Sequence, residues 1–284
     1  MHLLKVDLSH QPLLTEKFKK LDLEISEYSF SNVFLFREIH DYQLFYKNEL
    51  FLRGVTRIGS VFLMPTNHFM DHMSIEEIRS HLQEVDFFYP IPEEWLGAFD
   101  PNIFHYSYNM DDSDYLFTLE KMRTFHGTHS NAKSNLVKQL LERNRVETYT
   151  LNLDQIGPAL NVLDYWQKNQ DLDFSKTDYF SCKEGVNLIN KLQLSGVIAY
   201  VNHEPAGFII GERLGKKSFV VHFVKGNKSI KGIYPYLYQI LAESLDEGIE
   251  FINLEQNMGL TQLRQSKQSY HPDRMIHKWS IRLT

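Results

Sequence analysis

The sequence contains a single cysteine, Cys182, among 284 residues. One cysteine excludes an intramolecular disulfide framework and is typical of proteins from a reducing compartment. A chain of this length buries about three quarters of its unfolded surface, so its core needs no cross-links. The 20 phenylalanines, 15 tyrosines and 3 tryptophans also exclude an intrinsically disordered chain, because they supply a large apolar area for burial.

Long apolar runs are lacking as well. No stretch approaches the ~20 consecutive apolar residues that a membrane-spanning helix needs. Residues 1–10 do not show the pattern of a secretory signal, and no low-complexity segment or long linker interrupts the chain. The sequence therefore predicts a folded cytoplasmic protein without a transmembrane segment.

The sequence also lacks an excess of positive charge, and its formal net charge is −6. This balance excludes a protein that coats nucleic acid or anionic membranes. The distribution is uneven, however: residues 213–231 carry six cations and no acid, and residues 260–284 carry five cations and one acid. Two basic segments of this kind permit a polyanionic partner focused at one site.

The second half of the chain reads as a mixed sheet with helices. Turn-forming residues separate successive β-rich runs, and the helix between the last two runs opens near Pro235 and closes at Gly248. Ser181 and Glu184 fit a capping box for an earlier helix, and Asp154 fits a helix cap. The predicted strands are residues 148–153, 197–201, 207–214, 218–224 and 251–255.

The first half repeats much of this order. Residues 42–46 and 50–53 predict a hairpin, residues 60–64 a third strand, and Ser74 with Glu77 a capped helix. The sequence therefore predicts an α+β protein of two tandem domains, each a mixed central sheet flanked by helices. We place the domains at residues 1–121 and 122–284, with a linking helix and a candidate cleft in the second. One large mixed sheet is the alternative.

The most distinctive segment is residues 251–272, FINLEQNMGLTQLRQSKQSYHP. It resembles the closing motif of a family related to the C-terminal domain of phosphatidylglycerol lysyltransferases, whose pattern runs roughly E-Q-D-x-G-x-x-x-L-R-x-x-K-x-x-Y-x-P. Residues 28–37 and 132–140 are similar to an aromatic segment and a basic helix start of the same family. The matching positions of the closing motif are Glu255, Gln256, Gly259, Leu263, Arg264, Lys267, Tyr270 and Pro272.

This resemblance implies a tandem pair of GNAT-type acyltransferase folds and the transfer of an acyl or aminoacyl group. The donor would be an aminoacyl-tRNA or an acyl-CoA, so the resemblance implies a charged tRNA or a phosphate-bearing small molecule as the partner. Two positions depart from the pattern: Asn257 stands where the family has aspartate, and the basic helix start is reduced to Lys133 between Ala132 and Ser134. A non-catalytic phosphate-binding module on the same fold and an acyl-CoA N-acyltransferase are the alternatives.

Acyl transfer needs a base for the acceptor's proton and donors for the oxyanion. Glu255 is the only carboxylate between Ile252 and Met258, and it is the candidate base; its alternative role is an ion pair with Arg264 or Lys267. Tyr270 is the second candidate catalytic residue, either as a donor to the oxyanion or as a packed side chain. The candidate substrate-binding residues are Gln256, Asn257, Arg264 and Lys267.

Acyl-CoA enzymes of this fold hold the pyrophosphate with a glycine-rich loop between the third strand and its helix. The equivalent residues 225–235 read KGNKSIKGIYP, with Tyr234 in place of the second glycine. The match is partial, and it makes Lys228, Lys231 and Gly232 the candidate cofactor-binding residues. Residues 65–73 of the first half contain no glycine, which predicts no cofactor there.

Other catalytic patterns are absent from the sequence. His68 and His72 are four residues apart and His126 and His129 three apart, but none belongs to an H-E-x-x-H motif or has a cysteine partner. We therefore expect no metal site. No G-x-S-x-G motif supports serine catalysis. Cys182 lacks a nearby His–acid pair and is expected to be a buried thiol.

Overall fold

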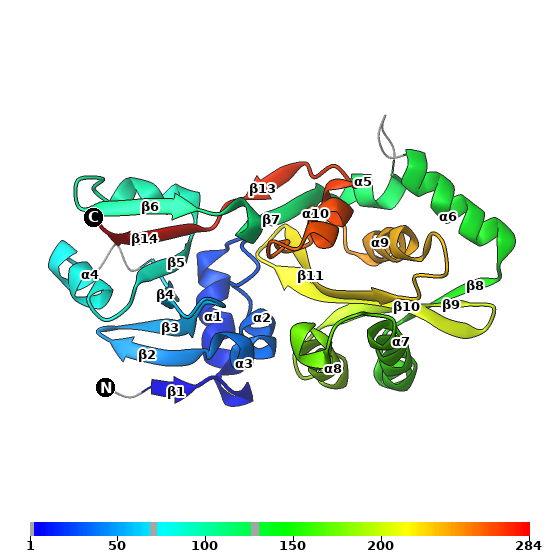
Figure 1. Cartoon of the computed structure of the whole chain (residues 1–284), viewed down its shortest axis with the longest axis horizontal. Helices are drawn as coiled ribbons and strands as arrows, with labels where there is room; N and C mark the ends of the chain where they lie inside the picture. The colour runs from blue at the N-terminus through cyan, green and yellow to red at the C-terminus, as the bar shows by residue number, and fades with distance from the viewer. Residues whose placement is uncertain (1–2, 69–72, 126–130) are drawn as a thin grey trace. The chain divides into compact units, whose positions relative to one another are not determined.

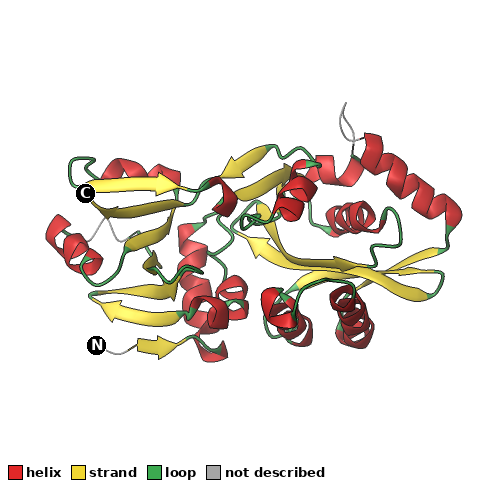
Figure 2. Cartoon of the chain, viewed as in Figure 1, coloured by secondary structure: helices red, strands yellow, loops and turns green. Residues whose placement is uncertain are grey.

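The computed structural model describes residues 3–68, 73–125 and 131–284, and it is an α+β protein (Figures 1 and 2). The chain folds into two compact units. Unit 1 comprises residues 1–114, 256–261 and 275–284, and unit 2 comprises residues 115–255 and 262–274. Among the described residues, no helix is both long and apolar enough to cross a membrane.

The sheet of unit 1 has seven strands in the order β1-β2-β3-β4-β5-β14-β6. Only β4 and β5 are parallel neighbours, and the other pairs are antiparallel. The strands are β1 (Leu3–Lys5), β2 (Gln43–Lys47), β3 (Glu49–Val55), β4 (Val61–Pro65), β5 (Phe87–Ile91), β6 (Phe104–Tyr108) and β14 (Trp279–Leu283). The α-helices are α1 (Gln11–Leu21), α2 (Phe30–Leu35), α3 (Arg37–His40) and α4 (Ile75–Leu82).

The sequence dictates these elements locally. Asn48 takes the left-handed conformation (φ 65°) in the tight turn between β2 and β3, a conformation that asparagine tolerates well. Phe51 on β3 is fully buried and packs against Phe88 of β5, with ring centroids 5.7 Å apart. The predicted capping box of α4 is confirmed, because Ser74 and Glu77 exchange side-chain-to-backbone hydrogen bonds.

The sheet of unit 2 also has seven strands, in the order β13-β7-β12-β11-β10-β9-β8. They are β7 (Asp114–Thr118), β8 (Val146–Thr150), β9 (Ser195–Val201), β10 (Glu204–Leu214), β11 (Ser218–Gly226), β12 (Phe251–Asn253) and β13 (Arg274–Ile276). The α-helices are α5 (Leu119–Thr124), α6 (Asn131–Arg143), α7 (Ile156–Lys168), α8 (Tyr179–Asn187), α9 (Ile233–Ser244) and α10 (Thr261–Gln268). Figure 1 shows α7 and α8 on one face of β10 and β11, and α9 on the other.

Two neighbouring parallel strands of this sheet, β11 and β12, form the edge at which the candidate site lies. β11 pairs with β12 in parallel over three residues, from Ser218 with Phe251 to Val220 with Asn253. β12 ends there, whereas β11 continues to Gly226. The carboxyl ends of parallel strands are where open α/β sheets commonly bind ligands, because side chains from both strands reach the space outside the sheet edge.

Most of the predicted strands are confirmed, and a single large sheet is excluded because the strands form two sheets. Three local predictions are wrong. α9 ends at Ser244 rather than near Gly248, and Arg123 donates hydrogen bonds to the carbonyls of Ala242 and Leu245 at that end. α8 begins at Tyr179, so Ser181 lies inside the helix. The side chain that caps the turn before α7 is Asn152 rather than Asp154.

The domain limits that we predicted at residues 121 and 122 differ from the limits of the two compact units. Unit 1 ends at Asp114, and the last ten residues of the chain return to it. They do so because β14 lies between β5 and β6 and pairs with both. A strand that completes a sheet from the far end of the chain carries no local sequence signal, so the return is a property of the tertiary fold.

Candidate functional site

Glu255 follows the end of β12 by two residues and has a left-handed backbone (φ 58°). That conformation costs a non-glycine residue about 1–2 kcal/mol and persists only where surrounding contacts enforce it. Here the amide of Glu255 donates to Asn253 Oδ1 (2.7 Å), and its carbonyl accepts from the Tyr115 amide (3.3 Å) and from Lys267 Nζ (3.1 Å). The backbone of Glu255 is therefore fixed from three sides.

The Glu255 side chain contacts a buried histidine. His222 Nδ1 lies 2.9 Å from Glu255 Oε1, and His222 Nε2 lies 2.9 Å from Glu212 Oε1. The His222 side chain is fully buried, whereas Glu255 and Glu212 are 13% and 17% exposed. Burial disfavours the charged ring, but the hydrogen bonds and charges of Glu212 and Glu255 outweigh it and raise the pKa of His222 to about 9. At neutral pH the ring is an imidazolium between two carboxylates.

The register of the sheet brings these three side chains together. Glu212 of β10 pairs with Val220 of β11, so His222 is its diagonal neighbour on the same face. The register shifts at a bulge between Ile210 and Gly211, where a Cβ on Gly211 would lie 1.9 Å from the Val220 carbonyl. Only glycine fits such an approach. His222 and Glu212 were not predicted from the sequence, although the hairpin expected across residues 214–217 already made them diagonal neighbours.

The three other predicted residues of the closing motif in unit 2 lie on α10 or directly after it. Lys267 is buried and donates to the Glu255 carbonyl, and Arg264 is half-buried. Tyr270 is 5% exposed and lies among the rings of Phe117, Phe125 and Tyr238. Burial raises the pKa of Tyr270 well above its usual range, so its hydroxyl stays protonated at neutral pH. Its catalytic role stays a prediction.

Lys133, the one cation left at the start of the basic helix, contacts the closing motif. Lys133 of α6 donates to Ser269 Oγ (2.8 Å), and its Nζ lies 4.1 Å from the centroid of the Tyr270 ring. Partial burial lowers the pKa of Lys133. The one cation that this start retains is therefore used to hold Tyr270.

Gln256 and Asn257, the next two residues of the motif, belong to unit 1. Asn257 is almost fully buried, and its Oδ1 accepts a hydrogen bond from the Gly259 amide (2.9 Å) in a turn where Gly259 has a φ of 74°. An aspartate would accept the same bond through a carboxylate oxygen. Asparagine in place of the family's aspartate at position 257 therefore preserves the turn.

Gln256 joins a buried charged cluster of unit 1 that was not predicted from the sequence. Lys278 Nζ donates to Gln256 Oε1 (2.8 Å) and contacts Asp114 (2.6 Å) and Glu27 (2.7 Å). Burial disfavours the charge of Lys278, but Asp114 and Glu27 outweigh it and raise the pKa of Lys278 above its usual value. Burial raises the pKa of Glu27 to about 7, with Lys278 opposing and Asp114 adding to the rise.

The loop between β11 and α9 uses several of its amides internally. The amides of Asn227 and Ile233 donate to the carbonyls of Ala206 and Ile230, and those of Ser229 and Ile230 both donate to Asn227. The Tyr234 hydroxyl donates to the Gly226 carbonyl (3.1 Å) and closes the loop. A pyrophosphate needs amides that point outward. Because these four amides donate within the protein, they are not arranged to bind a pyrophosphate.

The three candidate cofactor-binding residues lie on this loop. Lys231 is exposed, and Lys228 Nζ donates to Gln170 Oε1 (3.2 Å). Gly232 precedes α9 with a φ of 91°, and a Cβ there would lie 2.5 Å from the Leu136 carbonyl of α6. The backbone of α6 therefore packs closely against Gly232, directly before α9.

We expect Gly232→Ala to lower the free energy of unfolding by about 2–5 kcal/mol, from about 1–2 for the left-handed backbone and about 1–3 for overpacking. Gly59→Ala is the matched control, because Gly59 has the same φ of 91° but no atom within 4 Å of a Cβ. Urea unfolding followed by circular dichroism measures both variants. Equal losses would mean that α6 does not press on Gly232.

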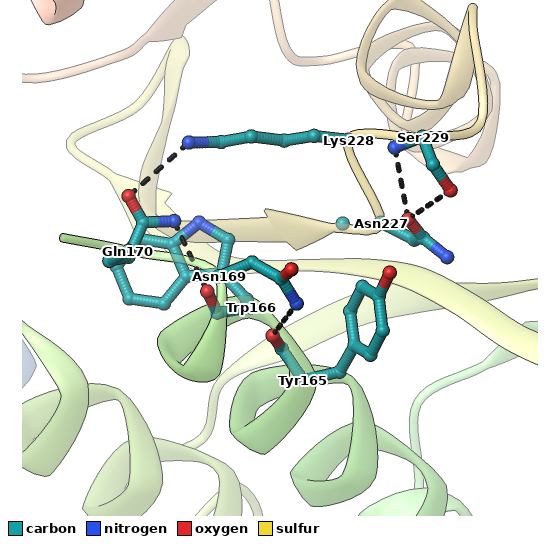
Figure 3. Close-up of a pocket in the computed structure, with 8 residues that line it drawn as sticks. Tyr165, Trp166, Asn169, Gln170, Asn227, Lys228 and Ser229 are labelled. Carbon is teal, nitrogen blue, oxygen red and sulfur yellow. Dashed lines mark hydrogen bonds between the residues drawn. The ribbon is translucent and has the colours of Figure 1, made fainter.

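A cavity of about 90 Å³ lies at the carboxyl end of α7, against the first residues of the same loop (Figure 3). Asn169 and Gln170 donate from their side chains to the carbonyls of Tyr165 and Trp166 (2.8 and 3.2 Å). The carboxyl end of a helix carries partial negative charge and disfavours phosphate. The cavity therefore fits a few water molecules rather than a phosphate group. It is lined by Tyr165, Trp166, Asn169, Gln170, Gly226, Asn227, Lys228 and Ser229.

Two further expectations concern metal ligands and the thiol. Among the described residues no group of three or more His, Cys, Asp or Glu side chains could hold a metal ion. His68 packs against Trp95, with ring centroids 4.7 Å apart, whereas His72, His126 and His129 lie outside the described residues. Cys182 is fully buried as predicted, and burial raises the pKa of its thiol above the usual value.

Residues 18–282 match the family described as phosphatidylglycerol lysyltransferase, C-terminal. A conserved protein of unknown function from Bacteroides thetaiotaomicron superposes with a TM-score of 0.86 at 20% identity, covering 99% of each chain. The C-terminal domain of a candidate lysylphosphatidylglycerol synthetase from Agrobacterium fabrum gives 0.62 at 12% identity, over 97% of this chain and 92% of that one. L-PGS from Bacillus licheniformis gives 0.56 at 15% identity, over 85% and 84%. No curated protein sequence matches. The likenesses establish a tandem GNAT-like fold.

Proposed function

The chain belongs to the phosphatidylglycerol lysyltransferase C-terminal family, and we propose that it transfers an aminoacyl or acyl group to an amine or hydroxyl acceptor at Glu255. Family and fold associate it with such transfer in general. The proposed site lies within residues 122–284, the second predicted domain.

The conformation of Glu255 is the observation that carries the proposal. A left-handed carboxylate residue, held by three backbone hydrogen bonds at the carboxyl end of a parallel strand, stores strain where ligands commonly bind. The Glu255 side chain is 13% exposed, and its Oε1 lies 2.9 Å from His222 Nδ1. A carboxylate in that state can accept a proton.

The proposed step begins with a donor in which an oxygen or sulfur atom carries the acyl carbon. Glu255 takes the acceptor's proton as the acceptor atom bonds to that carbon. The bond from the acyl carbon to the donor atom then breaks, and the donor atom leaves with a proton, so that the proton on Glu255 is returned overall. In this scheme Tyr270 stabilises the oxyanion, and Arg264 and Lys267 bind the substrates. The binding roles of Gln256 and Asn257, which belong to unit 1, stay predictions.

We favour an aminoacyl-tRNA over an acyl-CoA as the donor. The amides of Asn227, Ser229, Ile230 and Ile233 donate within the protein, and the backbone of α6 packs against Gly232 before α9. Lys228 and Lys231 then serve as point charges for phosphates of the donor rather than as parts of a pyrophosphate cradle.

A donor test decides between these functions. At a free concentration of 100 times its Kd, a donor that binds only the folded chain stabilises it by about 2.7 kcal/mol. We expect aminoacyl-tRNA to raise the melting temperature and to lose its labelled amino acid to an added lipid or amine acceptor, while acetyl-CoA does neither. Deacylated tRNA is the control for binding through the nucleic acid alone.

The other outcomes identify the alternatives. If acetyl-CoA alone stabilises the chain, the protein is an acyl-CoA N-acyltransferase and the tRNA donor is wrong. If a phosphate-bearing compound stabilises it but no transfer occurs with either donor, the protein is a non-catalytic binding module on the same fold.

A further inference from the structure

His222 is a fully buried titratable side chain that the proposed step does not use. It lies in the middle of β11, and each ring nitrogen is 2.9 Å from a different carboxylate. A neutral imidazole donates from one nitrogen only, so its other nitrogen would present a lone pair to an anionic oxygen. An imidazolium donates from both. With both carboxyl groups ionised, the geometry on both sides of the ring therefore fits the charged form.

We propose that His222 is a positioning residue for the transfer step: as an imidazolium clamped between Glu212 and Glu255, it holds the Glu255 carboxylate in one orientation at the end of β12. Glu212 is the anchor that keeps the ring charged and in place. This inference rests on the proposed function, because it assigns a task to the neighbours of the base.

Each part of the clamp has a separate support. Glu212 is a residue of β10 and follows Gly211 at the bulge. The far end of the clamp therefore belongs to the central strands of the sheet. Glu255 follows the short strand β12 and is fixed through its backbone. His222 spans the place where the pairing between β11 and β12 has ended. The side chains thus replace the missing backbone pairing at the point where the carboxylate must be held.

The other groups near this face do not supply a competing charge to the ring. The register shift places Glu212 and His222 on the face of the sheet that α7 and α8 cover, whereas α9 packs on the opposite face, through Ile233 and Leu237 against Gly207. Lys225 of β11 also lies on the α7 and α8 face, where its Nζ is 3.8 Å from the centroid of the Trp166 ring and donates to Asp178 (2.7 Å), so its charge is paired. Lys267 of α10 donates to the Glu255 carbonyl rather than to its carboxylate. Glu212 and Glu255 are the two carboxylates bonded to the ring.

Glu212→Gln tests this arrangement without touching the base. An amide keeps the shape and an acceptor oxygen but removes one of the two anions, so the protonated ring loses support and its pKa falls. We expect kcat for the transfer to fall on the order of 10-fold with KM unchanged, the scale typical of groups that orient a reacting residue. We also expect the alkaline limb of the pH profile, near pH 9 in the unaltered protein, to move to lower pH by about one unit or more.

Nuclear magnetic resonance of ¹⁵N-histidine-labelled protein gives a readout that needs no substrate. We expect both ring nitrogens of His222 to carry protons at pH 7.5, and the signal to titrate at lower pH in Glu212→Gln. His222→Gln identifies the signal. Glu147→Gln is the matched control, because Glu147 faces the exposed His203 at 3.4 Å and lies far from β11 in the sheet order. It should change neither kcat nor the His222 signal.

The two possible failures are distinguishable. A neutral His222 at pH 7.5, or a Glu212→Gln variant with unchanged kcat and pH profile, overturns the clamp while transfer by the unaltered protein still supports the proposed function. Absence of transfer with every donor in the unaltered protein overturns the proposed function and, with it, any positioning role of His222. A Glu212→Asp variant that restores the alkaline limb would support the clamp further.

Discussion

Glu255→Gln is expected to reduce kcat/KM for the transfer by about 10²- to 10⁴-fold, the usual contribution of a general base. The amide keeps an oxygen that accepts from His222 and removes the group that takes the acceptor's proton. The backbone contacts of residue 255 are unchanged by the substitution, so the fold should persist. Transfer of a labelled amino acid from aminoacyl-tRNA, measured at several donor concentrations, separates kcat from KM.

Glu250→Gln is the control for this experiment. Glu250 precedes β12 by one residue and forms an exposed ion pair with Lys217, so its loss should leave transfer within about twofold. A Glu255→Gln variant that binds its donor poorly but turns it over at the normal rate would assign Glu255 to substrate binding. Normal turnover with normal binding would remove Glu255 from the mechanism.

Lys278→Met is expected to lower the free energy of unfolding by about 3–5 kcal/mol, because it leaves Asp114 and Glu27 buried without their cation. The deficit should shrink as the pH falls. Burial already raises the pKa of Glu27 to about 7 from its usual 4.5, so the folded chain binds this proton more tightly than the unfolded chain. That contribution to stability is present at low pH and is lost as the pH rises through 7. Without Lys278 the cost of the two anions at higher pH is larger still.

Urea unfolding at several pH values from 5 to 8 measures this dependence. Lys47→Met is the matched control in the same unit, since its ion pair with Glu84 is partly exposed and should be worth less than about 1 kcal/mol. Adding Glu27→Gln and Asp114→Asn to Lys278→Met should recover much of the loss, because it removes the unpaired charges. A loss below about 1 kcal/mol for Lys278→Met, independent of pH, would contradict the view that this cluster is an intact charged network.

Local signals account for the parts of the fold that the sequence predicts. The hairpin at Asn48, the capping box of Ser74 and Glu77, and the strands β8 to β12 follow from residues within a few positions of each other. β7 and β13 were not predicted. Where local signals compete, prediction fails: Ser181 and Glu184 have the spacing of a capping box, yet α8 already begins at Tyr179. A short motif specifies a helix start only when no earlier residue can provide one.

The candidate site also has a part that the sequence predicts and a part that it does not. The closing motif identifies Glu255, Gln256 and Lys267 because residue type and spacing are properties of one segment. It does not indicate which of them are used for structure. The Tyr270 ring packs in an aromatic cluster whose members, such as Phe117, are distant in the sequence, whereas Asn257 bonds to Gly259 within the motif itself.

The sequence by itself determined the α+β class, because composition and periodicity act over short distances along the chain. It predicted the tandem arrangement with one large sheet as the alternative, and the resemblance of residues 251–272 identified the segment that holds the candidate base. Only the tertiary structure decided the state of that base. The clamp joins Glu212 and His222 of one hairpin to Glu255 at the end of β12, and Lys278 meets Glu27 across 251 residues. Register and burial arise when distant segments share one core. They therefore fix the charges of these groups, which no local pattern encodes.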